Sequence, residues 1–564
     1  MSGDGTTGYS GTSVLWASRI AIGVTVGLIV LFAGCGDGGG GSDLDPFDGS
    51  RVSPARRYGG TAVVGGGKDI STFNSLVSTD IVARDHQRFV LFATLVRLDE
   101  NSAELPYLAE SWDISPDSTL ITFNLRDDLF WHDGRPTTAR DVAFTFERAK
   151  DPDVPFPNRG DFDLWEEVEV LDEHTIRFHL RPHAGFLYGW SQLAIMPAHI
   201  LADVPPEELS THPFGTSQPV GNGPFRFVER VPGDRWVFEA NDDFPPDLGG
   251  RPYLDRLVYR VIPEDATLLA ELRTGGIDMY RDMPPGMAVR LTEDLSIRVM
   301  KAVTSGYAFI AWNSKRAFFR SPALRRAITL AIDRQALVDA AREGMGSVAT
   351  GPVGPWHWAY DSSWTALPFA PDSARAILDA GGWIDRDGDG VRDRNGLPFR
   401  FEILTNESSV RRDMAVMVQS NLAAVGIDAQ PRQREPGSLA AAVTSPDRRY
   451  DAVLIVWVRD VGKIDDRDLW ACDRIGNPWQ FTSYCNRELD PVLDSIPITL
   501  DRERRGELIR QYHQMVAADQ PYTFLYNEMR TAGVRRSLKG VEIDIRGDWI
   551  SVIDWWILPA FRNR

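Results

Sequence analysis

The first half of the chain contains short segments in which apolar and polar residues alternate. Residues 121–126 and 176–181 have this pattern, which is typical of strands with one buried face. Between them, residues 137–148 open with Thr138 three residues before Asp141, a spacing that satisfies the free amides at the start of a helix. Strands and helices are therefore expected to alternate in this half.

Two helices are predicted in the second half. One begins with Ser321 as its N-cap and Pro322 in its first turn, and its apolar residues, as far as Ile332, line one face. The other spans residues 371–380 and stops at two glycines, which adopt the left-handed conformation at low cost. Because no repeat of fixed period is visible, these segments favour a mixed α/β, two-lobed body over a solenoid or an all-β array.

Length and charge narrow the class of protein. A chain of 564 residues is long enough for about three or four domains, or for two large lobes. Its 61 basic and 79 acidic residues leave a formal charge of −18. This charge argues against a nucleic-acid partner, because the phosphate backbone repels an excess of carboxylates. The hydrophobic fraction of 43% is ordinary for a folded globular protein.

The N-terminal region carries export signals. Residues 20–35 contain no charged side chain, and this run is short for a bilayer span but suits the apolar part of a secretory signal. The small residues before Cys35 resemble a bacterial lipobox, in which the cysteine is lipidated and becomes the new N-terminus. We expect a signal peptide over residues 1–34 and a flexible, glycine-rich tether over residues 35–57. The alternative is an uncleaved membrane anchor. Both interpretations place the rest of the chain outside the cytoplasmic membrane, in the periplasm or at the outer face of that membrane.

Nine short segments along the chain carry a family resemblance. They are residues 105–112, 123–126, 130–134, 138–144, 219–225, 259–263, 309–313, 324–328 and 521–525. These segments resemble the bacterial extracellular solute-binding proteins of family 5, the substrate-binding subunits of peptide ABC transporters. Each segment is weak alone, but the set follows the order of the family, and the resemblance extends from about residue 58 to residue 560. The resemblance implies a receptor that captures a peptide and delivers it to a membrane permease.

The resemblance also implies an α/β fold of the two-lobed, periplasmic-binding-protein-like type II class. Lobe I would comprise residues 58–304 and 531–564, and lobe II residues 305–530, with crossovers near Ser305 and Arg530 acting as the hinge. A cleft between two lobes removes a small ligand from water when it closes, and binding shifts the equilibrium between open and closed states. We expect such a receptor to be a monomer.

The apolar run at residues 450–457 predicts a buried strand whose end faces the ligand crevice. There the spacing of Trp457 and Asp460 resembles the family segment whose aspartate pairs with the α-ammonium group of a bound peptide. A desolvated carboxylate opposite an ammonium group makes a strong, charge-assisted hydrogen bond. The alternative is that Asp460 pairs with Arg459 or Arg467 on a solvated loop.

Other features leave the ligand class open. Ser78 and Thr79 fall where the family presents strand-edge groups to a peptide main chain, and the alternative for this pair is a turn or a helix cap. The charged residues 465–468 depart from the pattern of dipeptide receptors and are expected to form a solvated face. The 17 tryptophans keep an oligosaccharide or another small solute, for uptake or for sensing, as an alternative to a peptide.

A disulfide is expected near the C-terminal end. Cys472 and Cys485 lie in an exported chain, where disulfides persist. Their surroundings resemble the disulfide loop of the dipeptide-binding relatives, which implies that the two cysteines are bridged.

An acidic segment matches part of a calcium-binding loop. Asp385, Asp387, Asp389 and Asp393 occupy positions 1, 3, 5 and 9 of that template, but position 12 is Gly396 where a bidentate glutamate is needed. We expect a tight Asp/Gly turn, with a structural calcium as the alternative and no other cofactor.

The motifs of common hydrolases and of phosphate-binding loops are missing from the sequence. His132 and Asp133 lie in a strand-turn segment, so we interpret them as structural. We therefore do not expect an enzyme. A glycoside hydrolase is the remote alternative, because paired carboxylates are plentiful in so acidic a chain.

Overall fold

The alternating segments of the first half form neighbouring strands of a four-stranded antiparallel sheet. A computed structural model of the protein describes residues 45–459 and 465–562. Buried residues alternate along the two central strands of this sheet. Between these strands in sequence, α2 (Ala139–Lys150) starts with the predicted capping box, in which the Thr138 N–H donates to Asp141 Oδ2 over 2.9 Å. In spatial order the strands are β4 (Ala109–Ile114), β5 (Leu120–Leu125), β7 (Thr175–Leu180) and β6 (Trp165–Val170).

A mixed 11-stranded sheet contains two long central strands, β12 (Ile297–Trp312) and β19 (Tyr522–Arg535). The other strands, in spatial order, are β17 (Asp428–Arg434), β16 (Arg400–Asn406) and β18 (Ala452–Val458) on one side of this pair, and β11 (Met279–Tyr280), β1 (Thr61–Gly66), β10 (Arg256–Val261), β9 (Arg235–Ala240) and β8 (Phe225–Val231) on the other, with β13 (Gly346–Val348) paired to β19. Short two-stranded pairs are β2 (Val96–Leu98) with β3 (Glu104–Pro106), β14 (Asp393–Arg394) with β15 (Leu397–Pro398), and β20 (Leu538–Lys539) with β21 (Trp556–Ile557).

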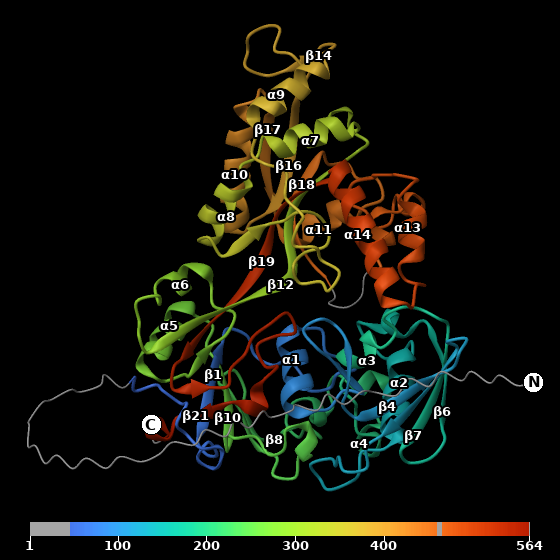
Figure 1. Cartoon of the computed structure of the whole chain (residues 1–564), viewed down its shortest axis with the longest axis vertical. Helices are drawn as coiled ribbons and strands as arrows, with labels where there is room; N and C mark the ends of the chain where they lie inside the picture. The colour runs from blue at the N-terminus through green and yellow to red at the C-terminus, as the bar shows by residue number, and fades with distance from the viewer. Residues whose placement is uncertain (1–44, 460–464, 563–564) are drawn as a thin grey trace, which may run out of the picture. The chain divides into compact units, whose positions relative to one another are not determined.

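The strands β12 and β19 run side by side and antiparallel along most of their length (Figure 1). Their register is interrupted between Val303 and Tyr307. We call this middle part, around Ser305 and Arg530, the strand crossover. Both predicted hinge positions lie in it, whereas the division of the chain into lobes at residues 304 and 531 stays a prediction.

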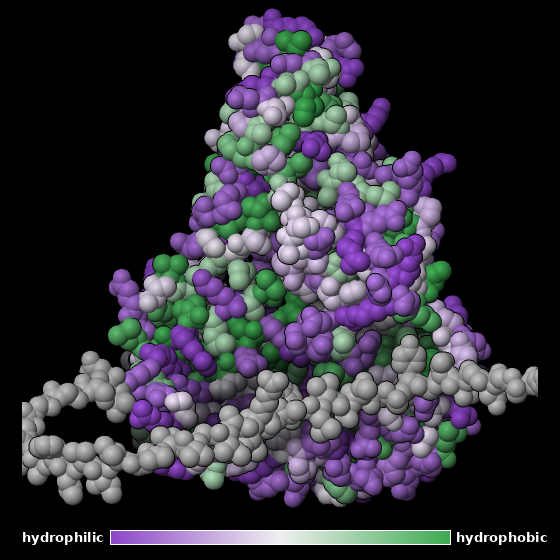
Figure 2. Space-filling view, in the orientation of Figure 1, coloured by the Kyte–Doolittle hydropathy of each residue, from purple (hydrophilic) through white to green (hydrophobic). Residues whose placement is uncertain are grey.

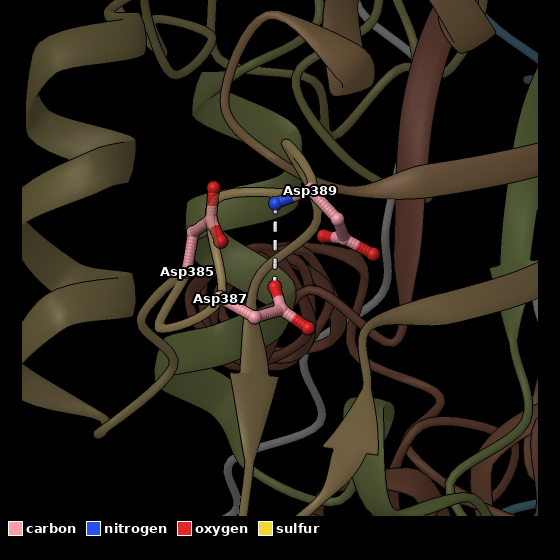
Figure 3. A group of neighbouring side chains, drawn as sticks. All are labelled: Asp385, Asp387 and Asp389. Carbon is pink, nitrogen blue, oxygen red and sulfur yellow. Dashed lines mark hydrogen bonds between the residues drawn. The ribbon is translucent and has the colours of Figure 1, made fainter.

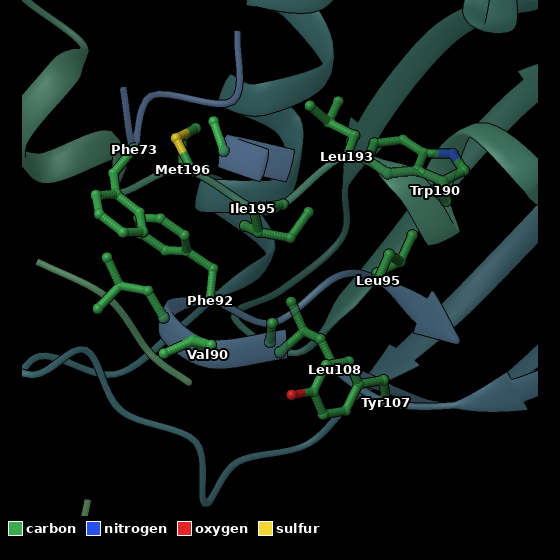
Figure 4. Close-up of a cluster of buried hydrophobic side chains, with 14 of the residues drawn as sticks. Phe73, Val90, Phe92, Leu95, Tyr107, Leu108, Trp190, Leu193, Ile195 and Met196 are labelled. Carbon is green, nitrogen blue, oxygen red and sulfur yellow. The ribbon is translucent and has the colours of Figure 1, made fainter. Parts of the chain in front are cut away.

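The two ends of these strands belong to different hydrophobic cores. Ala532 and Val534 of β19 join a large core of the N-terminal half, part of which is shown in Figure 4. Beyond the crossover, successive residues of β12 point to opposite faces of the sheet. Ala308 packs into one core and Phe309 into another, because both faces of the sheet are covered there.

The helix predicted from Ser321 is shorter than expected, since α7 (Pro322–Leu330) ends before Ile332. Asp333 then caps a new helix, α8 (Arg334–Arg342), by accepting a hydrogen bond of 3.0 Å from the Ala336 N–H. An aspartate that accepts a main-chain hydrogen bond favours a helix start over a helix interior. The predicted helix α9 (Pro371–Ala380) is present, and Gly382 after it is left-handed with φ +78°.

The remaining helices cover the sheets or connect their strands. They are α1 (Ile81–His86), α3 (Tyr188–Gln192), α4 (Ala198–Leu201), α5 (Asp265–Thr274), α6 (Pro285–Val289), α10 (Ser409–Ala423), α11 (Pro436–Thr444), α12 (Arg467–Trp470), α13 (Asp490–Ser495) and α14 (Arg502–Asp519). Within residues 45–459 and 465–562, none of the helices combines the length and the apolar character that crossing a bilayer requires. Hydrophilic and hydrophobic residues are intermixed on the face of the molecule seen in Figure 2.

Candidate ligand-binding site at the strand crossover

The end of β18 is attached to the strand crossover. Trp457 lies opposite Tyr307 and Val458 opposite Gly306 in the antiparallel pairing of β18 with β12. One residue further on, the Arg459 N–H donates to the Ser305 carbonyl oxygen over 3.3 Å, and the Ser305 hydroxyl donates to the Arg459 carbonyl oxygen over 2.5 Å. The strand that the sequence assigned to the ligand site therefore ends at the predicted hinge.

A buried ion pair follows directly. Arg459 donates to both carboxylate oxygens of Asp466, over 2.7 Å to Oδ2, and the two side chains are only 5% and 3% exposed. Asp466 also accepts a hydrogen bond from the hydroxyl of Tyr512 on α14, and that hydroxyl accepts one from the Trp470 indole N–H over 2.7 Å. The prediction that residues 465–468 form a solvated face is therefore wrong for Asp466.

Burial and the neighbouring charges fix the protonation states of the side chains in this cluster. Burial by itself would lower the pKa of the Arg459 guanidinium, but the Asp466 carboxylate outweighs burial, and the pKa lies above its ordinary value. Burial raises the pKa of the Tyr512 hydroxyl well above its ordinary value, so this group stays a neutral donor. The acidic composition of residues 465–468 was the only sequence signal for this cluster, and it does not distinguish a buried carboxylate from a solvated one.

The predicted anchor Asp460 lies outside the described residues. The arginines proposed as its alternative partners both have other carboxylates beside them. Arg459 binds Asp466, and Arg467 pairs with Asp473 over 3.0 Å. The pairing of Asp460 with a peptide ammonium group stays a prediction.

Aromatic side chains surround the predicted ligand residue Trp457. Its ring centroid lies 5.4 Å from that of Trp479 and 5.6 Å from that of Phe481. Trp457 is half-buried, whereas Trp479 is 47% exposed. The tertiary structure thus adds Trp479 to the surroundings of Trp457.

Ser78 and Thr79 do not belong to a β-strand. They lie in the irregular segment before α1, where Ser78 is buried and Thr79 is exposed. The next residue, Asp80, caps α1 by accepting a hydrogen bond of 2.7 Å from the Ala83 N–H. The strand-edge geometry expected for this pair is therefore not present, and its contact with a ligand stays a prediction.

Cys472 and Cys485 are joined by a disulfide, with their Cα atoms 4.6 Å apart. The loop that they close is tied to the protein by Arg448, whose Nε donates to the Gln480 carbonyl oxygen over 2.6 Å. The bridge therefore supports a segment that includes the exposed Trp479.

We expect removal of this bridge to lower the free energy of unfolding by about 3 kcal/mol, because a closed loop of about 14 residues restricts the unfolded chain. The variant replaces Cys472 and Cys485 by Ser together, and urea unfolding is compared with that of the wild type. Reductant should reproduce the loss in the wild type and leave the variant unchanged. Equal midpoints for both proteins without reductant would contradict the prediction.

The acidic segment forms a turn on the surface (Figure 3). Asp385, Asp387 and Asp389 are exposed, with carboxylate oxygens within 4.8 Å of one another. The Asp385 carboxylate accepts hydrogen bonds from the N–H groups of Gly388 and Gly390, over 2.7 Å and 3.1 Å, as an Asp/Gly turn requires. The fourth predicted ligand, Asp393, instead pairs with Arg386 over 2.9 Å. Calcium binding by this segment stays a prediction.

His132 and Asp133 do not form a dyad. The Nε2 atom of His132 lies 3.1 Å from the carbonyl oxygen of Gly223, and Asp133 pairs with His199 over 2.8 Å. Burial lowers the pKa of His132 to about 4. The imidazole is therefore neutral at physiological pH and linked to the main chain, as the structural interpretation of this segment requires.

A second buried charge cluster touches the other side of the crossover. Arg281 binds Asp85 over 3.1 Å and Asp548 over 3.2 Å, and Asp548 also binds Arg530 of β19 over 2.9 Å. The four residues of this network come from four separate segments of the chain. No local motif could therefore have indicated it.

Comparisons with known proteins give the class of the whole chain. The family model for bacterial extracellular solute-binding proteins, family 5 middle, matches residues 105–468. The oligopeptide-binding protein AppA of Bacillus subtilis is 30% identical over 507 residues, which are 89% of this chain and 92% of that protein. The dipeptide-binding protein of Escherichia coli is 26% identical, over 84% of this chain and 90% of that protein.

A solved structure agrees with these matches. The structure of AppA from Bacillus subtilis in complex with a nonapeptide has a TM-score of 0.70 to this chain and covers 89% of it, with 99% of AppA covered in turn. The predicted two-lobed α/β class is thereby confirmed. The chain belongs to the bacterial extracellular solute-binding proteins of family 5.

Proposed function

We propose that the protein is the extracytoplasmic substrate-binding component of an ABC transporter, and that it captures peptides in a cleft at the strand crossover. The observation that carries this proposal is the similarity, along nearly the whole chain, to AppA, whose solved complex contains a nonapeptide. Family 5 consists of solute-binding proteins, so capture without chemical change is the activity that the family supports.

The crossover offers a physical route from ligand binding to a change of shape. A ligand that contacts both lobes stabilises the closed state, because only that state makes both sets of contacts. Arg459, directly after β18, is hydrogen-bonded to Ser305 in β12. A ligand bound at the end of β18 would therefore contact a segment that is bonded to the hinge strand. The permease would then distinguish the occupied receptor from the empty one by its conformation.

The attachment of the protein to the membrane is part of the proposal. Cleavage before Cys35 and lipidation of this cysteine would anchor the protein at the membrane that holds the permease, with the glycine-rich residues that follow as the tether. The last part of the predicted tether, residues 35–57, is structured, because Pro54–Arg56 form a 3-10 helix and the Arg56 carbonyl oxygen accepts a hydrogen bond of 2.6 Å from Arg562. Cys35 lies outside the described residues. Its lipidation is tested by incorporation of a radiolabelled fatty acid. Incorporation into the wild type, and none into Cys35→Ala, is the expected result.

The predicted anchor is tested with Asp460→Asn. We expect this variant to bind a free peptide at least thirtyfold more weakly than the wild type, because a buried ammonium group without its carboxylate costs about 2 kcal/mol or more. The N-acetylated form of the same peptide should lose little, since it has no ammonium group. Isothermal titration calorimetry measures both affinities.

The matched control is Asp465→Asn, which removes a neighbouring exposed carboxylate. It should bind the free peptide within about twofold of the wild type. Equal losses for the free and the acetylated peptide in Asp460→Asn would remove the assigned role. The peptide itself is found first, by mass spectrometry of material released from the denatured protein.

An oligosaccharide is the second candidate ligand, and the exposed Trp479 beside Trp457 favours it, since indole rings stack on sugar rings. Titration with an oligosaccharide series, next to the peptide series, separates the two ligand classes. Recovery of the ligand unchanged after prolonged incubation separates a receptor from a glycoside hydrolase.

A further inference from the structure

Two hydrogen-bonded contacts connect the N-terminal half with the part of the chain beyond the crossover. In one, Arg502 at the start of α14 donates to the carbonyl oxygens of Asn101, over 2.5 Å, and of Ser102, over 3.4 Å, in the turn between β2 and β3. In the other, the Ala184 N–H donates to the carbonyl oxygen of Pro497, over 2.6 Å, in the segment between α13 and α14. We call these contacts of Arg502 and Pro497 the latch.

The latch connects two separate hydrophobic cores. Val96 of β2 belongs to the large core of the N-terminal half, whereas Leu508 and Tyr512 of α14 belong to one of the cores beyond the crossover. Helices α13 and α14 lie on the other side of the crossover from α5 and α6 (Figure 1). The latch is therefore a second connection between these cores, separate from the strands β12 and β19.

The guanidinium group of Arg502 is held in position on its own side of the latch. Its central carbon lies 4.3 Å from the centre of the Trp358 ring, and stacking on an indole fixes the orientation of the planar group. Within residues 45–459 and 465–562, no carboxylate forms an ion pair with Arg502, and the acceptors of its side chain are the two carbonyl oxygens of the turn. These acceptors are lost to Arg502 when the two cores move apart.

The turn that accepts these hydrogen bonds is held rigidly as well. The Asp99 carboxylate accepts hydrogen bonds from the N–H groups of Asn101 and Ala103, over 2.8 Å and 2.7 Å. Ser102 has a left-handed backbone with φ +58°, which a residue other than glycine adopts only where its surroundings impose it. Ser102 is also only 6% exposed. Because both sides are ordered before they meet, little conformational entropy is lost when the latch forms.

A contact that exists only when the two cores are together favours the closed state. The apparent affinity of a receptor rises with the fraction of molecules in the state that binds the solute. We infer that the latch at Arg502 stabilises the closed state and slows the release of every bound solute by the same factor. This inference rests on the proposed function and deepens it, because it names residues that regulate the cleft through closure and not through contact with the solute.

The first test compares Arg502→Ala with the matched control Arg504→Ala. Arg504 lies in the same turn of α14 but pairs with Glu507 on the exposed surface. Surface plasmon resonance measures the release of two nonapeptides of unrelated sequence that the wild type binds. In Arg502→Ala both should dissociate about tenfold faster, because hydrogen bonds from a charged donor are lost from the closed state only. In Arg504→Ala both rate constants should stay within about twofold of the wild type.

The second test observes the latch itself by hydrogen exchange. The Ala184 N–H is bonded across the latch, so its exchange rate reports how often the latch opens. Mass spectrometry follows exchange in the empty protein and in the complex with either nonapeptide. Ala184 should exchange about tenfold faster in Arg502→Ala than in Arg504→Ala. The amides of β5 should be equally protected in both variants, which excludes a general loss of structure.

The outcomes separate this inference from the proposed function. If the wild type binds no peptide, the proposed function fails, and the latch is then judged by exchange of the empty protein alone. Equal exchange at Ala184 in the two variants overturns the latch. It is also overturned if peptides bind but leave Arg502→Ala as slowly as the wild type, or if the two nonapeptides are affected by clearly different factors, since Arg502 would then contact the solute.

Discussion

Lowering the pH from 7 to 5 is expected to destabilise the protein strongly, because three buried histidines and the half-buried His132 stay neutral in the folded state and bind protons on unfolding. Burial lowers the pKa of His86, His357 and His513 to about 3, and that of His132 to about 4. Nearby guanidinium groups add to burial at three of these residues, Arg281 at His86, Arg459 at His357 and Arg226 at His132.

The sign follows from proton binding. An unfolded histidine has a pKa of about 6.5, so below this pH the unfolded chain binds protons that the folded protein excludes. The free energy of unfolding therefore falls as the pH falls toward the folded-state pKa values. Each histidine contributes at most about 1.4 kcal/mol per pH unit. A buried carboxyl group with a raised pKa, that of Asp141, opposes this loss at the acidic end of the range.

Urea unfolding at several pH values between 7 and 5 measures this dependence. The control is His357→Gln. Its free energy of unfolding should depend less on pH than that of the wild type, because one histidine fewer binds a proton on unfolding. If stability were independent of pH in this range, or if His357→Gln followed the same slope as the wild type, the histidines would not be the cause.

Breaking the buried ion pair at the end of β18 should have the second large effect. In Asp466→Leu the guanidinium of Arg459 stays buried without its carboxylate, and Tyr512 loses its acceptor. We expect the free energy of unfolding to fall by about 3–5 kcal/mol, since an uncompensated buried charge is the dominant cost. Chemical denaturation measures the loss.

Two further variants identify the cause. Arg459→Met combined with Asp466→Leu removes both charges and should recover much of the stability, because no buried charge remains unpaired. Asp473→Asn breaks the exposed pair with Arg467 and should change the free energy of unfolding by less than about 1 kcal/mol. A double variant as unstable as Asp466→Leu would show that the side chains matter for packing and not for charge.

Local patterns were sufficient for elements with one buried face or a clear cap. Strands β5 and β7 alternate visibly because the core covers only one side of their sheet, and α2 starts where Thr138 and Asp141 cap it. The same reasoning extended the helix from Ser321 too far, since it did not weigh Asp333 as the cap of a second helix. Periodicity indicates which residues are buried, but competing caps decide where a helix ends.

The sequence by itself determined the family, the α/β class and the position of the predicted binding strand before Asp460. Each of these depends on short, ordered stretches of neighbouring residues. Only the tertiary structure decided that Asp466 is buried against Arg459, that Arg281 joins Asp85 to Asp548, and that Arg502 meets the turn at Asn101. Those contacts bring together distant segments, and a polar residue shows in its own sequence neither its burial nor its partner, because both are properties of the packed chain.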